Sequence, residues 1–125
     1  MEEVKPGISL ELAQEITPDQ SAARVGSGAL DVFSTPSMIG LMEKTSMKCI
    51  EPFLEESEST VGGAVNVRHY MPTAIGKRVT CRSEVISVKG RKIDFKVETF
   101  EDGKLIGDGN HVRFVVDKND FMNKI

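Results

Sequence analysis

The sequence has few of the residues that build metal centres. Its 125 residues include two cysteines, two histidines and no tryptophan, and the cysteines and histidines do not stand at the spacing of zinc ligands. Cys49 falls in an apolar helical pattern and Cys81 in a strand pattern, so we predict both to be small core residues in a reducing cytoplasm. A metal site is therefore not expected.

Long apolar runs and an excess of positive charge are also absent. No apolar run approaches the roughly 18 residues that span a bilayer, and the starting sequence MEEVKPG does not have the form of a secretory leader. The 16 basic residues are outnumbered by 19 acidic ones, and no aromatic stacking motif accompanies them, which excludes the usual footprint of a nucleic-acid-binding surface. We therefore expect a cytoplasmic protein that binds neither membranes nor nucleic acid.

What the sequence does contain is the composition of one ordinary folded domain. Apolar residues make up 39% and charged residues 28%, close to the average of soluble proteins. No repeat, low-complexity tract or linker divides the chain, and its length suffices for one hydrophobic core. Residues 1–125 are predicted to form a single domain.

The segment 34–52 is predicted to be a central helix. Thr35 is placed to cap it through its hydroxyl, Pro36 suits the first helical position, and Pro52 stops it. Its apolar residues spread around much of the circumference, which indicates a helix surrounded by other structure. Glu43 would then be an ionisable group in the middle of an enclosed helix.

Strand patterns occupy most of the remaining chain. Residues 8–16 alternate between apolar and polar, and four strand-like segments follow residue 60. A tight turn at Gly90 and the Asp102-Gly103 pair predict hairpins between the last three of them. One strand, one long helix and four antiparallel strands predict an α+β fold in which a curved sheet wraps a single helix.

Alternation along two strands predicts which side chains face that helix. Four residues of one strand are expected to be buried: Ile93, Phe95, Val97 and Thr99. In the last strand the inward set is expected to be Val112, Phe114 and Val116. His111 would then lie on the outer face, as a structural or surface residue.

Several candidate catalytic groups converge on the predicted helix. His69 shares the register of Val65 and Val67, so alternation points it toward the helix, where an ordinary core histidine is the main alternative. Glu43 is either a carboxylate in a cleft or the partner of a nearby lysine or arginine. The hydroxyl of Thr35 begins the helix.

A pair of glycines at the start of the first strand after the helix is a candidate source of main-chain N–H donors. Gly62 and Gly63 either form a strand bulge or let a substrate carbonyl approach a main-chain N–H. An imidazole, a carboxylate, a hydroxyl and free N–H groups are together the parts of an acyl-transfer site.

Five sequence segments resemble one known family. They are VFSTPSMIGLMEK, TVGGAVNVRH, PTAIG, VKGRKIDFKVE and HVRFVVDK, in this order, between residues 30 and 118. Together they are similar to the hotdog-fold thioesterases of the fluoroacetyl-CoA thioesterase type. The resemblance implies a catalytic set of Thr35, Glu43 and His69, with Gly62 and Arg113 as substrate-binding residues.

The resemblance also implies an activity and an assembly. The activity is hydrolysis of a small acyl-CoA thioester without metal or redox cofactor, with coenzyme A as part of substrate and product. The assembly is a homodimer whose two sheets join edge to edge and whose sites lie at the protomer interface; pairing of dimers into tetramers stays open. Thr35 and Glu43 are about 12 Å apart along one helix, too far for a direct hydrogen bond. Either the helix begins later, or a substrate lies between them, or the site takes residues from two protomers; the last is favoured because the family is dimeric.

Two other functions and one specificity stay as alternatives. A hotdog protein of this kind can bind acyl-CoA without catalysis, or act as a hydratase or dehydratase. The relative that selects fluoroacetyl-CoA carries aromatic lid residues ahead of its threonine, whereas residues 26–30 here are GSGAL. We therefore do not expect fluoroacetyl selectivity, and the sequence leaves the acyl chain open.

Overall fold

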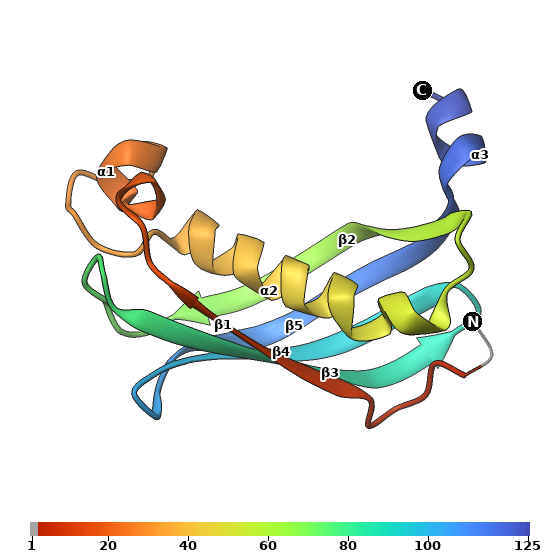
Figure 1. Ribbon diagram of the computed structural model, residues 1–125, viewed down its shortest axis with the longest axis horizontal. Coiled ribbons are helices and arrows are strands. Elements are labelled where there is room, and N and C mark those ends of the chain that lie inside the picture. The colour runs from red at the N-terminus through yellow and green to blue at the C-terminus, as the bar shows by residue number, and fades with distance from the viewer. Residues whose placement is uncertain (1–2) are drawn as a thin grey trace.

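The computed structural model describes residues 3–125 and has one five-stranded antiparallel sheet wrapped around a long helix (Figure 1). This confirms the α+β architecture predicted from the sequence. The strand order is β1-β3-β4-β5-β2. The elements in chain order are β1 (Ser9–Glu15), η1 (Pro18–Gln20), α1 (Ala22–Val25), α2 (Thr35–Ile50), η2 (Glu51–Phe53), β2 (Glu58–His69), β3 (Arg78–Lys89), β4 (Lys92–Glu101), β5 (Lys104–Asp117) and α3 (Lys118–Asn123).

Helix α2 begins where the sequence predicts, but its capping residue differs. Ser34 is the cap, because its hydroxyl oxygen accepts a hydrogen bond from the Ser37 N–H at 3.1 Å. The prediction that Thr35 caps the helix is therefore wrong. The Thr35 hydroxyl does not cap the helix and is available for a contact outside it.

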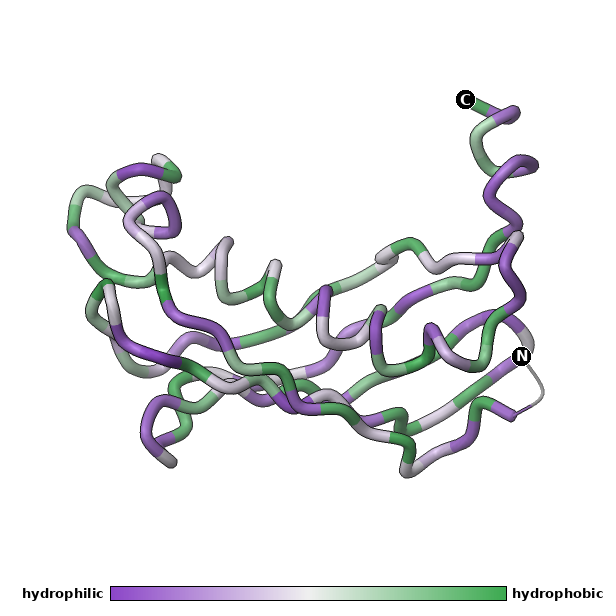
Figure 2. Tube along the Cα trace, in the orientation of Figure 1, coloured by the Kyte–Doolittle hydropathy of each residue, from purple (hydrophilic) through white to green (hydrophobic). Residues whose placement is uncertain are grey.

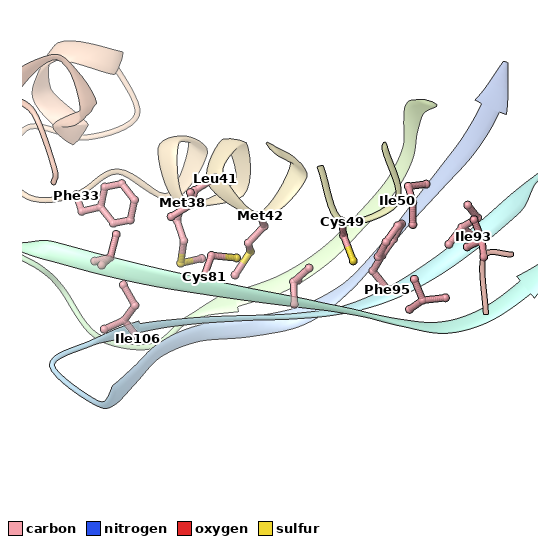
Figure 3. Close-up of a cluster of buried hydrophobic side chains, with 14 of the residues drawn as sticks. Phe33, Met38, Leu41, Met42, Cys49, Ile50, Cys81, Ile93, Phe95 and Ile106 are labelled. Atoms are coloured by element: carbon pink, nitrogen blue, oxygen red, sulfur yellow. The ribbon is translucent and has the colours of Figure 1, made fainter. Parts of the chain in front are cut away.

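The apolar surface of α2 is a broad face and does not encircle the helix. Gly40, Lys44 and Lys48 form an exposed strip, four residues apart. The opposite side carries fully buried residues such as Met38 and Met42, whose side chains point toward the sheet in Figure 3. The prediction that other structure surrounds the helix is therefore wrong, because one side of α2 is exposed.

The inward face of β4 agrees with the prediction. Its four expected residues are all 0% exposed: Ile93, Phe95, Val97 and Thr99. Figure 2 shows the alternation of apolar and polar residues along the strands. This face and α2 enclose the core.

The faces of β5 are the reverse of the prediction. His111 is paired directly opposite Phe95 of β4, and directly opposed residues of neighbouring strands point to the same side of a sheet. His111 and Arg113 are consequently buried, at 1% and 6% exposure, whereas Phe114 is 39% exposed on the outer face. The polar side chains of this strand therefore point toward α2.

Candidate functional site

The start of α2 meets the end of β2 through a hydroxyl and an imidazole. Thr35 Oγ1 lies 2.9 Å from His69 Nδ1. The buried ring of Phe33 packs edge-on against the imidazole, with ring centroids 6.3 Å apart. The predicted orientation of His69 toward the helix is confirmed.

The surroundings of His69 favour a neutral ring with one nitrogen free. Burial lowers the pKa of His69 below its usual 6.5, and the nearby backbone of Met71 opposes this shift. Its Nε2 is buried and has no hydrogen-bond partner among residues 3–125. A neutral imidazole can take a proton from a substrate or a water that reaches this nitrogen.

A pocket of about 300 Å³ opens beside this pair. Its lining comes from three places: the α1 region, the start of α2 and the turn after β2. The volume lies at the small end of the range for small-molecule sites. The lining includes Ala22, Ser27, Val32, Phe33, Tyr70 and Met71. The pair therefore borders a space suited to a compact substrate group.

A second group of side chains surrounds Glu43 in the middle of α2. Glu43 Oε2 is 3.9 Å from Arg113 Nη1, and the Glu43 side chain is 42% exposed. A Cβ added at Gly62 would lie 2.9 Å from the same carboxylate oxygen. Only glycine at this position leaves the carboxylate room to approach β2, so Gly62 and Glu43 form one structural unit.

The charge of Arg113 is buried, and three of its five N–H donors bond to protein atoms. Its Nε donates to Thr60 Oγ1 at 2.8 Å and its Nη2 to the Thr60 carbonyl at 3.0 Å. Its Nη1 lies 3.1 Å from His111 Nε2. Burial lowers the pKa of Arg113, and the charge of Glu43 opposes this shift. The role of Arg113 in binding substrate stays a prediction. Its hydrogen bonds in this structure go to Thr60 and His111, not to a substrate.

Thr60 and His111 were not identified as part of a site from the sequence. The hydrophobic alternation of β5 pointed His111 outward. The spacing to Arg113 carried the opposite signal, because residues two apart in a strand share a face. Once Arg113 is expected inside, His111 must be expected inside as well.

Within one chain the two groups are separate. Thr35 and Glu43 are eight residues apart on α2, about 12 Å along the axis. Gly62 and His69 are seven residues apart on β2, about 20 Å in an extended strand. The chain thus brings Thr35 to His69 and Glu43 to Gly62 and Arg113, but it does not join all five.

Residues 3–125 contain no group of three or more histidines, cysteines and acidic residues that could hold a metal ion, and no helix among them is long and apolar enough to cross a membrane. A larger hollow, of about 590 Å³, borders Lys77, Arg78 and Phe100 and contains none of the candidate side chains.

The depressed histidine pKa values predict how stability depends on pH. Burial lowers the pKa of both His69 and His111 below 6.5. The unfolded chain therefore binds more protons than the folded chain just below that pH, and stability must fall as the pH decreases. Urea unfolding should give a lower free energy of unfolding at about pH 5 than at about pH 7.5. His69→Gln and His111→Gln should each reduce this difference; a difference that neither substitution changes would contradict the prediction.

Comparison with known proteins identifies the family. The model of the family described as fluoroacetyl-CoA-specific thioesterase matches residues 16–119. The fluoroacetyl-CoA thioesterase of Streptantibioticus cattleyicolor is 36% identical over 95 residues, covering 76% of this chain and 68% of that protein.

Solved structures agree with this match. A mutant of the fluoroacetyl-CoA thioesterase FlK in complex with acetyl-CoA superposes with a TM-score of 0.92 at 28% identity, over 97% of this chain and 96% of that one. A hot-dog-like protein from Thermanaerovibrio acidaminovorans has a TM-score of 0.86 at 17% identity, over 95% and 88% of the two chains, and supports the fold alone. The fold is the hotdog fold, and the chain belongs to the fluoroacetyl-CoA-specific thioesterase family.

Proposed function

We propose that this protein hydrolyses a small acyl-CoA thioester. The observation that carries the proposal is the contact between Thr35 and His69 beside a pocket, with His69 Nε2 buried and without a partner. A neutral imidazole held by a hydroxyl at a substrate-sized pocket is suited to proton transfer at a reacting acyl group. Relatives in complex with CoA and with acetyl-CoA support this class of substrate.

The active assembly in this proposal is a homodimer formed through β2. This strand is an edge of the sheet, 12 residues long, and has neither proline nor lysine. Its central residues 62–66 are exposed. A long exposed edge without these residues can pair with another strand. A second copy of β2, related by a two-fold axis, would satisfy the unpaired backbone N–H and C=O groups of both strands.

The register of this pairing decides which side chains meet. In an antiparallel pair related by a two-fold axis through Asn66, Val67 lies opposite the partner's Val65. The bulge between Gly62 and Ala64 then brings the partner's Gly62 level with His69. The partner's Glu43 lies against that glycine. Each site then combines Thr35 and His69 of one chain with the partner's Glu43.

The chemistry follows from these positions. Water adds to the thioester carbonyl carbon while His69 takes its proton, and the Thr35 hydroxyl and the N–H of the partner's Gly62 stabilise the oxyanion. The intermediate collapses with cleavage of the carbon–sulfur bond, and the leaving thiolate of coenzyme A receives the proton from His69. Glu43 either orients and activates this water or itself attacks the carbonyl to give a transient anhydride that water then hydrolyses.

The direct test uses a panel of short acyl-CoA esters with a thiol reagent that detects free coenzyme A. The proposal predicts release of one thiol per ester hydrolysed, without added metal or redox cofactor. An enoyl-CoA assay by absorbance runs in parallel. Binding without thiol release would favour a non-catalytic module, and loss of enoyl absorbance alone would favour a hydratase.

Gly62 offers a sharper test of the carboxylate's position. In Gly62→Ala the new methyl would collide with Glu43 Oε2 at 2.9 Å, so the carboxylate must swing away from β2. We expect kcat/KM to fall by about tenfold to a hundredfold, as displaced catalytic groups commonly cause. Gly40→Ala is the matched control, because its Cβ meets no atom within 4 Å on the same helix. Equal activity in the two variants would count against a role for Glu43.

A further inference from the structure

His111 is an almost fully buried ionisable group that the proposed mechanism does not use. It is 1% exposed, and its ring stacks on Phe95 with centroids 6.2 Å apart and planes at 28°. It also lies beside Gly62, where an added Cβ would come within 3.4 Å of its Cε1. Burying an ionisable group costs free energy unless its polar atoms have partners, so the partners of this imidazole near Glu43 indicate its role.

The two hydrogen bonds of His111 fix its tautomer. Its Nδ1 lies 2.7 Å from the Ala64 carbonyl oxygen, which can only accept, so Nδ1 carries the proton. Its Nε2 lies 3.1 Å from Arg113 Nη1, which can only donate, so Nε2 presents its lone pair. A protonated ring would place two donors against each other at the second contact. The imidazole therefore fits its surroundings only when neutral.

The charges around His111 act in both directions. Burial is the main cause that lowers the pKa of His111, and the neighbouring charge of Arg113 adds to it. The Ala64 carbonyl and the carboxylate of Glu43 oppose the shift. These groups lie on β2, β5 and α2, and β4 covers the ring with the uncharged Phe95. The outcome is a neutral imidazole, as the hydrogen bonds require.

His111 completes the fixation of Arg113. Thr60 holds the Nε and Nη2 side of the guanidinium, and His111 holds Nη1, the nitrogen that faces Glu43 Oε2 at 3.9 Å. Because the guanidinium is a rigid planar fork, contacts on both sides determine its orientation. Without His111, the guanidinium would be held only on its Thr60 side, and the whole group could tilt so that Nη1 moves toward the carboxylate or away from it.

We propose that His111 is a positioning residue that, as a neutral hydrogen-bond acceptor, holds Arg113 at a set distance from the catalytic carboxylate of Glu43. This inference rests on the proposed thioesterase function for its kinetic consequence. Its structural content is the connected path from the Ala64 carbonyl through His111 and Arg113 to Glu43. That path links the β-bulge of the exposed edge strand to the middle of α2.

Two substitutions separate the acceptor from the donor of the imidazole. In His111→Gln the amide oxygen can occupy the place of Nε2 and accept from Arg113. In His111→Asn the amide nitrogen can replace Nδ1 and donate to Ala64, but the acceptor is lost. We expect His111→Asn to lower kcat about tenfold or more with KM changed less than about threefold, and His111→Gln to retain most of kcat.

A double-mutant cycle with Arg113→Lys tests whether the effect passes through the arginine. The loss caused by His111→Asn should be largely absent in the Arg113→Lys background, because the group it positions is gone. Additive losses would overturn the proposal. Ser83→Ala is the control for stability alone, because the buried Ser83 hydroxyl lies 2.7 Å from that of Ser46 and takes no part in the contacts of Arg113 or His69; it should leave kcat unchanged.

A spectroscopic measurement keeps the proposal testable without turnover. Nitrogen-15 NMR of the side chain in the unmodified protein should find the neutral ring with the proton on Nδ1 at neutral pH. A ring protonated on Nε2 would overturn the proposal even if the enzyme is active. If no acyl-CoA ester is hydrolysed, the proposed function is wrong. The NMR measurement still tests whether neutral His111 accepts a hydrogen bond from Arg113.

Discussion

Replacing Glu43 by glutamine, or His69 by alanine, is expected to remove nearly all acyl-CoA hydrolysis. General acid and base groups contribute about a hundredfold to ten-thousandfold each, so kcat should fall by at least about a hundredfold in either variant. Glu43→Gln keeps the shape of the side chain and removes its charge, and His69→Ala removes the unpartnered Nε2. Thiol release from a short acyl-CoA under saturating conditions measures the loss.

The control for this prediction is another carboxylate in a different part of the sheet. Glu11 is exposed on β1, at the edge opposite β2, so Glu11→Gln should leave kcat unchanged. Circular dichroism and thermal melting should show that all three variants are folded. Wild-type turnover in both Glu43→Gln and His69→Ala would refute the assignment of the catalytic set.

The parts of the fold that the sequence predicted are those governed by hydrophobic periodicity. The alternation of Ile93, Phe95 and Val97 identified the buried face of β4. The β3-β4 and β4-β5 hairpins followed from turn signals, and the long helix followed from the apolar pattern between Pro36 and Pro52. Burial of apolar area dominates at such positions, so the pattern determines the structure.

The prediction failed on β5 because polar side chains occupy the interior there. Arg113 hydrogen-bonds to both Thr60 and His111, so the burial of these side chains is compensated by partners that a sequence pattern does not reveal. The apolar Phe114 takes the outer face instead. Functional sites are where local rules and the final structure are most often in conflict.

The start of α2 is a similar case at the level of one residue. Ser34 and Thr35 are both good capping residues, and Pro36 is tolerated at either of the next positions. The structure uses Ser34 as the cap. Only the position of His69, 34 residues away in sequence, gives the Thr35 hydroxyl its partner, and no local signal contains that information.

A site that needs two chains is the feature that one sequence predicts least. The helix geometry indicated that Thr35 and Glu43 are too far apart for a direct hydrogen bond within one chain, and the structure places their partners in two groups. The proposed pairing of β2 with its own copy unites these groups. Size-exclusion chromatography with light scattering should therefore give a dimer as the smallest active species.

Complementation between two inactive chains is the second large effect that we expect. In a heterodimer of Glu43→Gln and His69→Ala chains carrying different tags, one site receives both substitutions. The other site combines an intact Glu43 with the partner's intact His69. Such a heterodimer has one of two sites and should regain about half of the wild-type rate, from two parents that are each inactive.

The matched control pairs two substitutions on the same side of the proposed site. Thr35 and His69 contact each other within one chain, so a heterodimer of Thr35→Ala and His69→Ala chains has a damaged residue in both of its sites. It should regain no activity. Purification through both tags in sequence excludes the parent homodimers from each measurement.

The rate of thiol release by the purified Glu43→Gln and His69→Ala heterodimer is thus the most direct measurement of a site shared between two copies of this chain. The shared site predicts about half of the wild-type kcat per dimer. A stable heterodimer as inactive as its parents would contradict it, because it would mean that the carboxylate and the imidazole of one site belong to the same chain.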